Sequence, residues 1–367
     1  MLNEPKYLSI KNDLQQNIIE GKFPLDSRIP SEAELRKVYD VSRHTIRQAI
    51  AELVNDGYLM KRQGAGTFVS NGYIKTLNED SIKTIGVITT YLSDYIFPSI
   101  IRGIEEELSS RQYSLLLSST QNNVLNEKES LEKMLEHNID GLIIEPTKSN
   151  ILNPNLNYFL KFSEKRIPMV MLNASYDELS APVIAMDDVE AGKLATQHLI
   201  DLGHTKIVII TKMDDLQGKN RLKGYVSALY DSKLSFDNKD IVTYDTESKD
   251  LLEDKINDSL NQENPPTAFV CYNDQIAIKL IHQIHAIGKS VPDDFSVVSH
   301  DDSFLSTTLP FVKLTTVSHP KEKLGKEAAN WIVNAIEDKD FDRQSIIFHP
   351  ELIVRDSTKS LIKEKLK

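Results

Sequence analysis

The stretch VSRHTIRQAI, at residues 41–50, places three side chains that can bind an anionic or hydrogen-bonding partner within five positions. Arg43 and Arg47 each carry a guanidinium fork that matches the paired acceptors of guanine or the oxygens of a phosphate, and His44 lies between them. The chain as a whole is acidic, with a formal net charge of -11 over 367 residues. A cationic cluster in such a protein is either a contact surface for a polyanion or only the solvated face of a helix.

A second group of polar side chains stands at the ends of predicted strands. Glu145, Asn173, Asn273 and Asp301 each follow an apolar run, and Arg221 is predicted to begin a helix after another one. Ligands of α/β folds bind at the carboxyl ends of the strands. Planar polar side chains in such places form the paired hydrogen bonds that hold a sugar, with an aromatic ring against its apolar face.

These residues also have plain structural alternatives. Asn273 is suited to capping the helix that follows it. Arg221 and Asp301 are suited to forming an ion pair with each other when the site is empty. Five polar groups at successive strand ends nevertheless favour a ligand site over five unrelated caps and turns.

The N-terminal segment carries the signals of two helices. Apolar side chains recur at helical spacing through residues 5–20, and Gly21 ends that pattern. Ser31 and Glu34 have the spacing of a capping box, which predicts a helix that ends near Tyr39.

A third helix and a hairpin follow. Ser42 is a candidate N-cap for a helix from residue 43 to about residue 55, whose predicted core side chains are Ile46, Ala49, Ile50 and Leu53. Residues 58–61 and 67–69 are β-prone runs around a glycine-containing tip. Three helices and a β-hairpin predict a winged helix-turn-helix, an α+β fold.

In a helix-turn-helix the second helix enters the major groove with its first residues on the base edges. Here those first residues are the cationic cluster. Lys6 is placed to reach a phosphate. The hairpin tip, residues 63–67, is placed to approach the adjacent minor groove. The predicted DNA contacts are Lys6, Arg43, His44, Thr45, Arg47, Gln63, Gly64, Gly66 and Thr67.

From residue 84 onward, apolar strands alternate with helical patterns. The predicted strands are Ile85–Thr89, Ser114–Leu117, Gly141–Ile144, Met169–Leu172, Ile207–Ile210, Ala268–Cys271 and Phe295–Ser299. Continuous apolar strands joined by helices predict parallel sheets covered on both faces, and about 280 residues exceed one comfortable core, so two α/β lobes are expected. The predicted domains are residues 1–70 and 84–367, joined by a polar linker at 71–83.

Composition narrows the possible classes. Residues 1–70 hold ten Lys or Arg against nine Asp or Glu, a charge of +1, so the remaining 297 residues carry -12. The single cysteine, Cys271, excludes an intramolecular disulfide and a cysteine-rich zinc site. No export signal, bilayer-spanning run, metal-ligand cluster, phosphate loop or nucleophile elbow is recognisable. We therefore expect a cytoplasmic protein that is not an enzyme and has no metal, cofactor or membrane partner.

Two smaller groups of residues receive a structural interpretation. His198, His204 and His319 are interpreted as ordinary structural histidines. Trp331 is expected to pack a C-terminal helix rather than stack on a ligand.

Residues 5–70 resemble the GntR family through the stretch IPSEAELRKVYDVSRHTIRQAIAELVNDGYLMKRQGAGTFV. The resemblance implies that Arg43, Thr45, Arg47, Gly66 and Thr67 face DNA. It also places Glu32 beside the recognition helix, where the carboxylate either accepts from a cytosine amine or holds Arg47. A third interpretation is that Glu32 is only a favourable charge at a helix N-terminus.

Residues 84 to about 355 resemble the LacI/GalR family, whose effector domain has the two-lobed fold of periplasmic binding proteins. The resemblance rests on DDVEAGKLATQHLIDLGHTKIVII, NRLKGY, CYNDQIAI and VPDDFSVVSHDDS. Ser299-His300-Asp301 departs from the family's usual Gly-Tyr/Phe-Asp, which puts the local turn in doubt more than the aspartate. The resemblance implies an effector site made of Tyr95, Phe97, Glu145, Lys148, Asn173, Gln217, Arg221, Asn273 and Asp301.

A chain that joins a GntR-type DNA-binding domain to a LacI/GalR-type effector domain is similar to the arabinose-responsive repressors of Gram-positive bacteria. The resemblance implies a homodimer that binds operator DNA and is released by a small sugar, L-arabinose. A repressor or activator for another sugar has the same architecture. Two other classes of protein are alternatives. A solute-binding protein would have no use for residues 1–70. A GntR-aminotransferase fusion would need a longer second domain.

Overall fold

The computed structural model describes residues 5–62, 65–70 and 83–362. Contacts divide the chain into two compact units, Met1–Ile82 and Lys83–Lys367. Gln63, Gly64 and residues 71–82 of the predicted linker lie outside the described residues.

The first unit is the predicted winged helix-turn-helix. Helices α1 (Lys6–Ile19), α2 (Glu32–Tyr39) and α3 (Arg43–Asn55) precede β1 (Leu59–Arg62), which pairs antiparallel with β2 (Gly66–Val69). The buried side chains that join the three helices include Leu14, Leu35, Ile46, Ile50 and Leu53. The fold class predicted for this segment is therefore confirmed.

Local capping explains why the helices of this unit begin and end where they do. Both hydrogen bonds of the Ser31–Glu34 capping box are present, and the Ser42 hydroxyl accepts from the backbone N–H of Thr45 at 3.2 Å. Between them Asp40 adopts the left-handed conformation, with φ of 47°, which turns the chain from α2 into α3. The predicted caps are confirmed.

The first lobe of the second unit is a parallel six-stranded sheet in the order β13-β7-β6-β5-β3-β4. Its strands are β3 (Thr84–Thr89), β4 (Ser114–Ser119), β5 (Gly141–Ile144), β6 (Met169–Leu172), β7 (Val183–Met186) and β13 (Ile346–Phe348). Helices α5 (Phe97–Ser110) and α12 (Lys321–Glu337) cover one face, and α6 (Val124–Glu136) and α7 (Leu156–Glu164) cover the other.

The second lobe is a six-stranded sheet in the order β14-β12-β11-β10-β8-β9. Its strands are β8 (Ile207–Lys212), β9 (Ile241–Tyr244), β10 (Ala268–Cys271), β11 (Ser296–Asp301), β12 (Thr315–Ser318) and β14 (Leu352–Ile353). Only β14 runs antiparallel to its neighbour. Helices α8 (Asp188–Asp201) and α9 (Leu216–Asp231) cover one face, and α10 (Leu252–Leu260) and α11 (Asp274–Ala286) cover the other.

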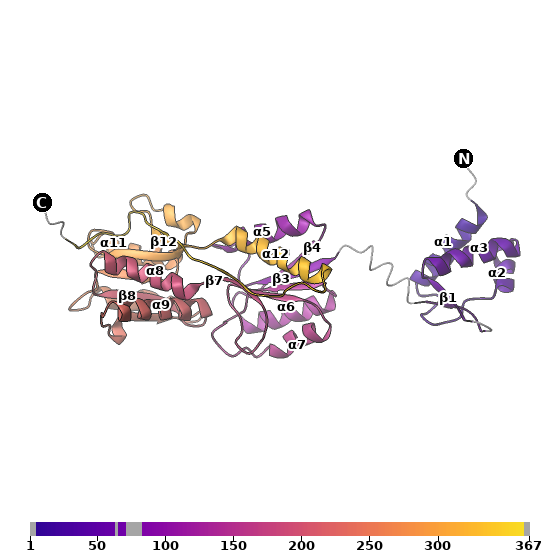
Figure 1. Cartoon of the computed structure of the whole chain (residues 1–367), viewed down its shortest axis with the longest axis horizontal. Coiled ribbons are helices and arrows are strands. Elements are labelled where there is room, and N and C mark those ends of the chain that lie inside the picture. The colour runs from indigo at the N-terminus through magenta and orange to yellow at the C-terminus, as the bar shows by residue number, and fades with distance from the viewer. Residues whose placement is uncertain (1–4, 63–64, 71–82, 363–367) are drawn as a thin grey trace. The chain divides into compact units, whose positions relative to one another are not determined.

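The chain passes between the lobes three times: from β7 to α8, from β12 to α12, and from β13 to β14. Figure 1 shows the consequence, since α12, coloured near the yellow end of the scale, lies beside α5 in the lobe built mainly from earlier residues. Each lobe is thus assembled from distant parts of the sequence. Besides these passages, the lobes are joined by side-chain contacts and by a backbone hydrogen bond of 3.2 Å from the N–H of Asn150 to the Asp214 carbonyl.

The predicted two-lobed α/β architecture is confirmed, with three differences in detail. The prediction omitted several short strands, among them β7 and β12. Strand β11 continues to Asp301, and α9 begins at Leu216, so Arg221 lies in the second turn of its helix rather than at its start. Trp331 packs α12 as expected, and its indole N–H donates to the Gln344 carbonyl at 3.0 Å.

Candidate nucleic-acid interface and interlobe cavity

Helix α3 divides its side chains between the core and the solvent. Ile46, Ala49 and Ile50 are buried, whereas Arg43, His44 and Arg47 are exposed. The side chains that the sequence assigned to DNA therefore share the open face of one helix, as a recognition helix requires.

Glu32, the first residue of α2, holds both arginines of this face. Its carboxylate oxygens lie 3.1 Å from Nε of Arg43 and 3.5 Å from Nε of Arg47. Each contact uses the inner nitrogen, and the terminal amino groups of both guanidinium groups make no hydrogen bond within residues 5–62 and 65–70. Of the alternatives for Glu32, its contact with Arg47 is observed, and the carboxylate also orients Arg43.

The remaining predicted DNA contacts lie on α1 and the hairpin. Lys6 is exposed at the first residue of α1, and Thr67 lies in β2. Gly66 has φ of 116° and packs against Arg28 so closely that a Cβ atom would lie 2.7 Å from Arg28 Nε. Only glycine suits that position. Gln63 and Gly64 lie outside the described residues.

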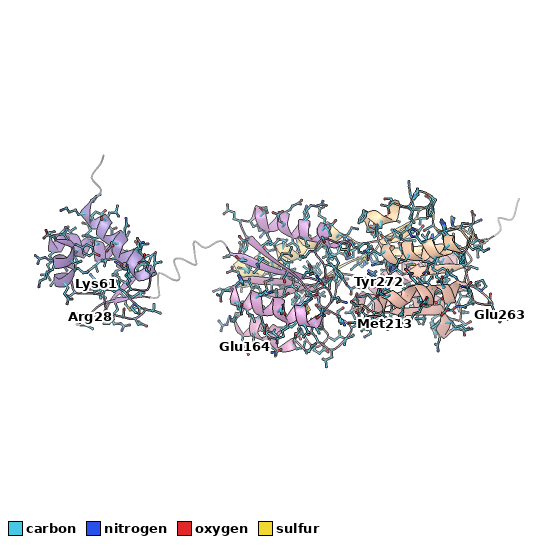
Figure 2. The ribbon with its side chains drawn as sticks, turned by 180° about the vertical axis from the view of Figure 1, so that it is seen from behind. Arg28, Lys61, Glu164, Met213, Glu263 and Tyr272 are labelled. Carbon is cyan, nitrogen blue, oxygen red and sulfur yellow. The ribbon has the colours of Figure 1, made fainter. Side chains whose placement is uncertain are left out.

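The hairpin carries cations that sequence reasoning missed. The backbone of Arg28 bridges to Phe68, and Arg62 lies over the Phe68 ring at 4.5 Å while pairing with Asp26 at 2.8 Å. Figure 2 labels Arg28 and Lys61 in this unit: Lys61 lies in β1, and Arg28 lies in the segment before α2, which bridges to β2. No local pattern singled out Arg28, because it comes before the capping box and joins the hairpin only through tertiary pairing.

In the second unit a cavity lies between the lobes. Figure 2 shows Tyr272 and Met213 on the side of the second lobe that faces the first, and Glu263 at the far end. The lining includes eight of the nine predicted effector residues: Tyr95, Phe97, Glu145, Asn173, Gln217, Arg221, Asn273 and Asp301.

Lys148 is the exception. It does not line the cavity, because its ammonium pairs with Glu247 of the second lobe. Its backbone N–H donates to Asn122 Oδ1 at 2.8 Å, and the Asn122 amide in turn donates to Thr246 at 2.7 Å and Asp214 at 3.2 Å. Lys148 therefore belongs to a set of contacts that fastens the two lobes at the rim.

Arg221 is the charged centre of the cavity wall. Its Nε donates to Asp188 at 2.8 Å, its Nη2 to Asp301 at 3.1 Å and its Nη1 to the Tyr272 carbonyl at 2.5 Å. Burial alone would lower the pKa of Arg221, but the Asp301 and Asp188 carboxylates raise it above its ordinary value. The guanidinium is therefore a fixed cation, and the predicted Arg221–Asp301 pair is present.

The two aspartates beside Arg221 differ in their acidity. Burial would raise the pKa of Asp301, yet Arg221 outweighs it and holds that pKa below its usual value. Burial raises the pKa of Asp188 to about 6, because Arg221 offsets only part of its desolvation and Asp301 repels its charge. Asp301 is thus the more acidic of the two carboxyl groups.

The backbone around Asp301 is held in an unusual conformation. Asp301 has φ of 91° and Asp302 has φ of 41°, both in the region that L-residues rarely adopt. The Lys321 ammonium donates to the carbonyls of Asp301 at 2.7 Å and Asp302 at 2.9 Å. The turn after β11, which the departure at Ser299-His300-Asp301 had put in doubt, is therefore pinned from the other lobe. The His300 ring lies buried and contacts the Cys271 carbonyl at 2.9 Å.

Two amide side chains of the cavity differ in how their polar atoms are used. Asn273 caps α11, since its Oδ1 accepts from the backbone of Ile276 at 3.1 Å, so the capping alternative is observed although the residue also lines the cavity. Gln217 Oε1 is buried without a hydrogen-bond partner in the part of the chain that the structure describes. Unpaired buried acceptors are rare and need an explanation, which a ligand hydroxyl would provide.

The cavity also contains residues that the sequence did not reveal. Asp188, Tyr272 and His319 line it, together with Lys212 and Asp215. Asp188 lies at an interlobe passage, and no residue pattern marks such a passage in advance. His319 was interpreted as an ordinary structural histidine, because its neighbours in the cavity come from distant strands.

Within residues 5–62, 65–70 and 83–362, no cluster of His, Cys, Asp and Glu side chains could hold a metal ion. No helix in those ranges is both long enough and apolar enough to cross a bilayer.

The chain is similar to known proteins along almost its whole length. Residues 6–69 match the bacterial regulatory proteins of the gntR family, and residues 196–358 match a periplasmic binding protein-like domain. The chain is 46% identical to an arabinose metabolism transcriptional repressor of Halalkalibacterium halodurans, covering 99% of both chains. It is also 46% identical to the repressor of that description from Geobacillus stearothermophilus, covering 97% of this chain and 98% of the other.

The structural comparison agrees on the fold of the larger unit. The transcription regulator CcpA of Lactococcus lactis superposes with a TM-score of 0.67 at 24% identity, covering 76% of this chain and 100% of the other. The GntR-type DNA-binding domain and the two-lobed effector domain predicted from the sequence are both confirmed.

Proposed function

Because this chain belongs to the family of arabinose metabolism transcriptional repressors, we propose that it represses transcription by binding operator DNA and is released by L-arabinose. The first unit is the DNA-binding domain, called the reader below. Arg43, His44, Thr45 and Arg47 contact base edges, Lys6 contacts a phosphate, and the hairpin tip approaches the adjacent minor groove. The protein acts as a homodimer in the cytoplasm, so two readers meet a two-fold symmetric operator.

The effector binds in the interlobe cavity. Arg221, Asp301, Asn273 and Asn173 form the hydrogen bonds to the sugar hydroxyls, and Gln217 supplies a further acceptor. The lining carries five carboxylates, of Asp94, Glu145, Asp188, Asp215 and Asp301, against the cations of Lys212, Arg221 and Lys249. This excess of negative charge favours a neutral sugar over a sugar phosphate or a sugar acid.

Release requires that the sugar bind more tightly to one arrangement of the lobes than to the other. The arrangement it favours is incompatible with both readers occupying their half-sites. A coupling free energy of about 1–3 kcal/mol is typical of such a linkage. No cofactor takes part.

The observation that carries this proposal is the convergence of eight predicted polar and aromatic residues on one cavity in a chain similar to arabinose repressors over its full length. Gel-shift assays with DNA that the protein selects from a random pool test it, with a panel of pentoses and hexoses added to the preformed complex. L-Arabinose should release the DNA at the lowest concentration. Release by another sugar, or by none, would contradict the effector assignment.

The protein has no enzymatic activity under this proposal. GntR-type readers fused to aminotransferase domains bind pyridoxal phosphate through a lysine. Incubation with pyridoxal phosphate should therefore produce no Schiff-base absorbance.

A further inference from the structure

His319 lines the interlobe cavity and has a buried ring nitrogen with no hydrogen-bond partner among the described residues. The residue lies in the passage from β12 to α12, is 6% exposed and lines the cavity. Its Nε2 lies 3.1 Å from Asn173 Oδ1, whereas its Nδ1 has no hydrogen-bond partner among the residues that the structure describes. One ring nitrogen is thus anchored, and the other has no partner among the described residues.

The anchor is itself oriented by a buried carboxylate. The Asn173 amide donates to Glu145 Oε1 at 2.8 Å, and the other Glu145 oxygen accepts the backbone N–H of Thr90 at 2.9 Å and the Thr90 hydroxyl. Burial raises the pKa of Glu145, and the hydrogen bonds from Thr90 and Asn173 oppose that shift. In its ionised form the carboxylate only accepts hydrogen bonds, so the NH2 group of Asn173 faces Glu145 and its carbonyl faces His319.

This order fixes the tautomer of the imidazole. A carbonyl oxygen cannot donate, so Nε2 of His319 carries the proton and Nδ1 is a bare lone pair. Burial lowers the pKa of His319 to about 4, which keeps the ring neutral at neutral pH. Glu145, Asn173 and His319 therefore form a relay in which each member determines the polarity of the next.

We propose that this relay makes His319 a specificity-determining residue that accepts a hydrogen bond from one hydroxyl of the effector. The inference rests on the proposed function, because it assigns a role within the same cavity. A ligand group at Nδ1 has to donate, so the site rejects an analogue whose hydroxyl is removed or replaced by fluorine, which accepts weakly and cannot donate.

A substitution at Glu145 should reverse the hydrogen-bond polarity of this relay. In Glu145→Gln the new side chain keeps an oxygen for Thr90 and turns its NH2 group toward Asn173. The Asn173 amide then flips, its NH2 group faces His319, and the proton of the imidazole moves to Nδ1. The variant therefore presents a donor to the cavity where the wild type presents an acceptor.

The first test reads the tautomer without any sugar. Long-range proton–nitrogen NMR spectra of the full-length protein with labelled histidine distinguish a protonated from a bare ring nitrogen, and His319→Gln assigns the signal. The wild type and the control Glu129→Gln, an exposed change in the same lobe, should show Nε2–H, and Glu145→Gln should show Nδ1–H. A wild type with Nδ1–H or a charged ring would overturn the relay, as would a folded Glu145→Gln that keeps Nε2–H. Asn173→Ala gives an independent check if Glu145→Gln does not fold, because it removes the anchor and should allow both tautomers.

The second test uses calorimetry with L-arabinose and its singly deoxygenated and singly fluorinated analogues. At one ring position both analogues should bind the wild type on the order of 10- to 100-fold more weakly than the parent sugar. At that position Glu145→Gln should bind the fluorinated analogue better than the deoxygenated one. If L-arabinose itself fails to bind, the proposed function is wrong, and the NMR result still decides the relay. If it binds and no position shows this pattern, the ligand contact of His319 is wrong.

Discussion

The hydroxyl of Tyr95 donates a hydrogen bond of 2.9 Å to Oδ2 of Asp301, and the two residues belong to opposite lobes. The same hydroxyl accepts from the backbone N–H of Asp274 at 3.2 Å. Tyr95 makes these contacts from a backbone φ of 58°, which is costly for a bulky side chain and persists only where the surroundings stabilise it. The atoms that close the cleft are therefore among the atoms that line the ligand site.

Tyr95→Phe should weaken effector binding by roughly 10- to 100-fold, since a hydrogen bond to a charged group contributes about 1.5–3 kcal/mol. The change removes the fastening between the lobes and keeps the aromatic ring. Calorimetry on the full-length protein measures it, with the exposed Tyr230→Phe as the matched control. Tighter binding by Tyr95→Phe would instead mean that the hydroxyl competes with the sugar for Asp301.

Arg47→Ala should lower operator affinity by roughly 10- to 100-fold, because a bidentate contact to a base contributes about 1–3 kcal/mol. Sugar affinity should stay unchanged, because the substitution lies in the other unit. Gel shift and calorimetry on the same preparation separate the two effects, and Lys165→Ala removes one positive charge from the sensor surface as a control. Loss of both affinities would indicate misfolding or a wrong division of the chain.

Asp301→Asn should give a repressor that stays on DNA at sugar concentrations that release the wild type. The substitution keeps the shape of the side chain and removes the charge that Arg221 Nη2 contacts at 3.1 Å. Loss of a buried charged partner typically costs about 2–5 kcal/mol, so effector affinity should fall by at least roughly 30-fold. Asp188 still pairs with Arg221 and should keep the variant folded. The exposed Asp250→Asn should respond as the wild type does, and normal release by Asp301→Asn would mean that the site is misplaced.

His300→Phe should flatten the loss of stability on acidification. Burial lowers the pKa of His300 to about 3, below its value of about 6.5 in an unfolded chain. Between these values the unfolded state binds one more proton than the folded state, so the free energy of unfolding falls as the pH falls through this window, by up to about 1.4 kcal/mol per pH unit. Phenylalanine removes that proton uptake, whereas the buried aspartates titrate in both proteins and cancel from the difference.

Urea unfolding of both proteins between pH 7 and pH 5 measures this difference. The free energy of unfolding of the wild type should fall more steeply with falling pH than that of the variant, so the gap between the two changes with pH, even if the lost contact with Cys271 makes the variant less stable at pH 7. A gap that does not change with pH would contradict the prediction. The exposed His137→Phe should leave the profile of the wild type unaltered.

Local sequence signals were sufficient to predict the fold of the DNA-binding domain. Ser31, Glu34 and Ser42 satisfy backbone groups within three residues of themselves, so their effect can be recognised in the sequence. The alternation of apolar runs and helices likewise predicted the two lobes, because a buried parallel strand needs only its own apolar residues to be recognised.

Tertiary structure determines which residues line the cavity, and the sequence did not reveal all of them. Lys148 follows Glu145 by three residues, yet its left-handed backbone and Glu247 of the other lobe take its ammonium out of the cavity. His319 and Asp188 line the cavity because each lies where the chain passes from one lobe to the other. Strand β12, Thr315–Ser318, has three hydroxyl side chains among its four residues, so it does not form the apolar run by which the other buried strands were recognised. Its position follows from its pairing with β11.

The order of assembly along the chain has a consequence for synthesis. Elements α1 to β2 are contiguous within residues 6–69, whereas the first lobe needs α12 and β13 and the second needs β14, all from the last part of the chain. Domains fold as they leave the ribosome, so the reader is complete long before either half of the sensor is. A chain that stops before residue 346 keeps every residue of the reader and lacks strands of both lobes, so an early stop codon separates DNA recognition from the control that the sugar exerts over it.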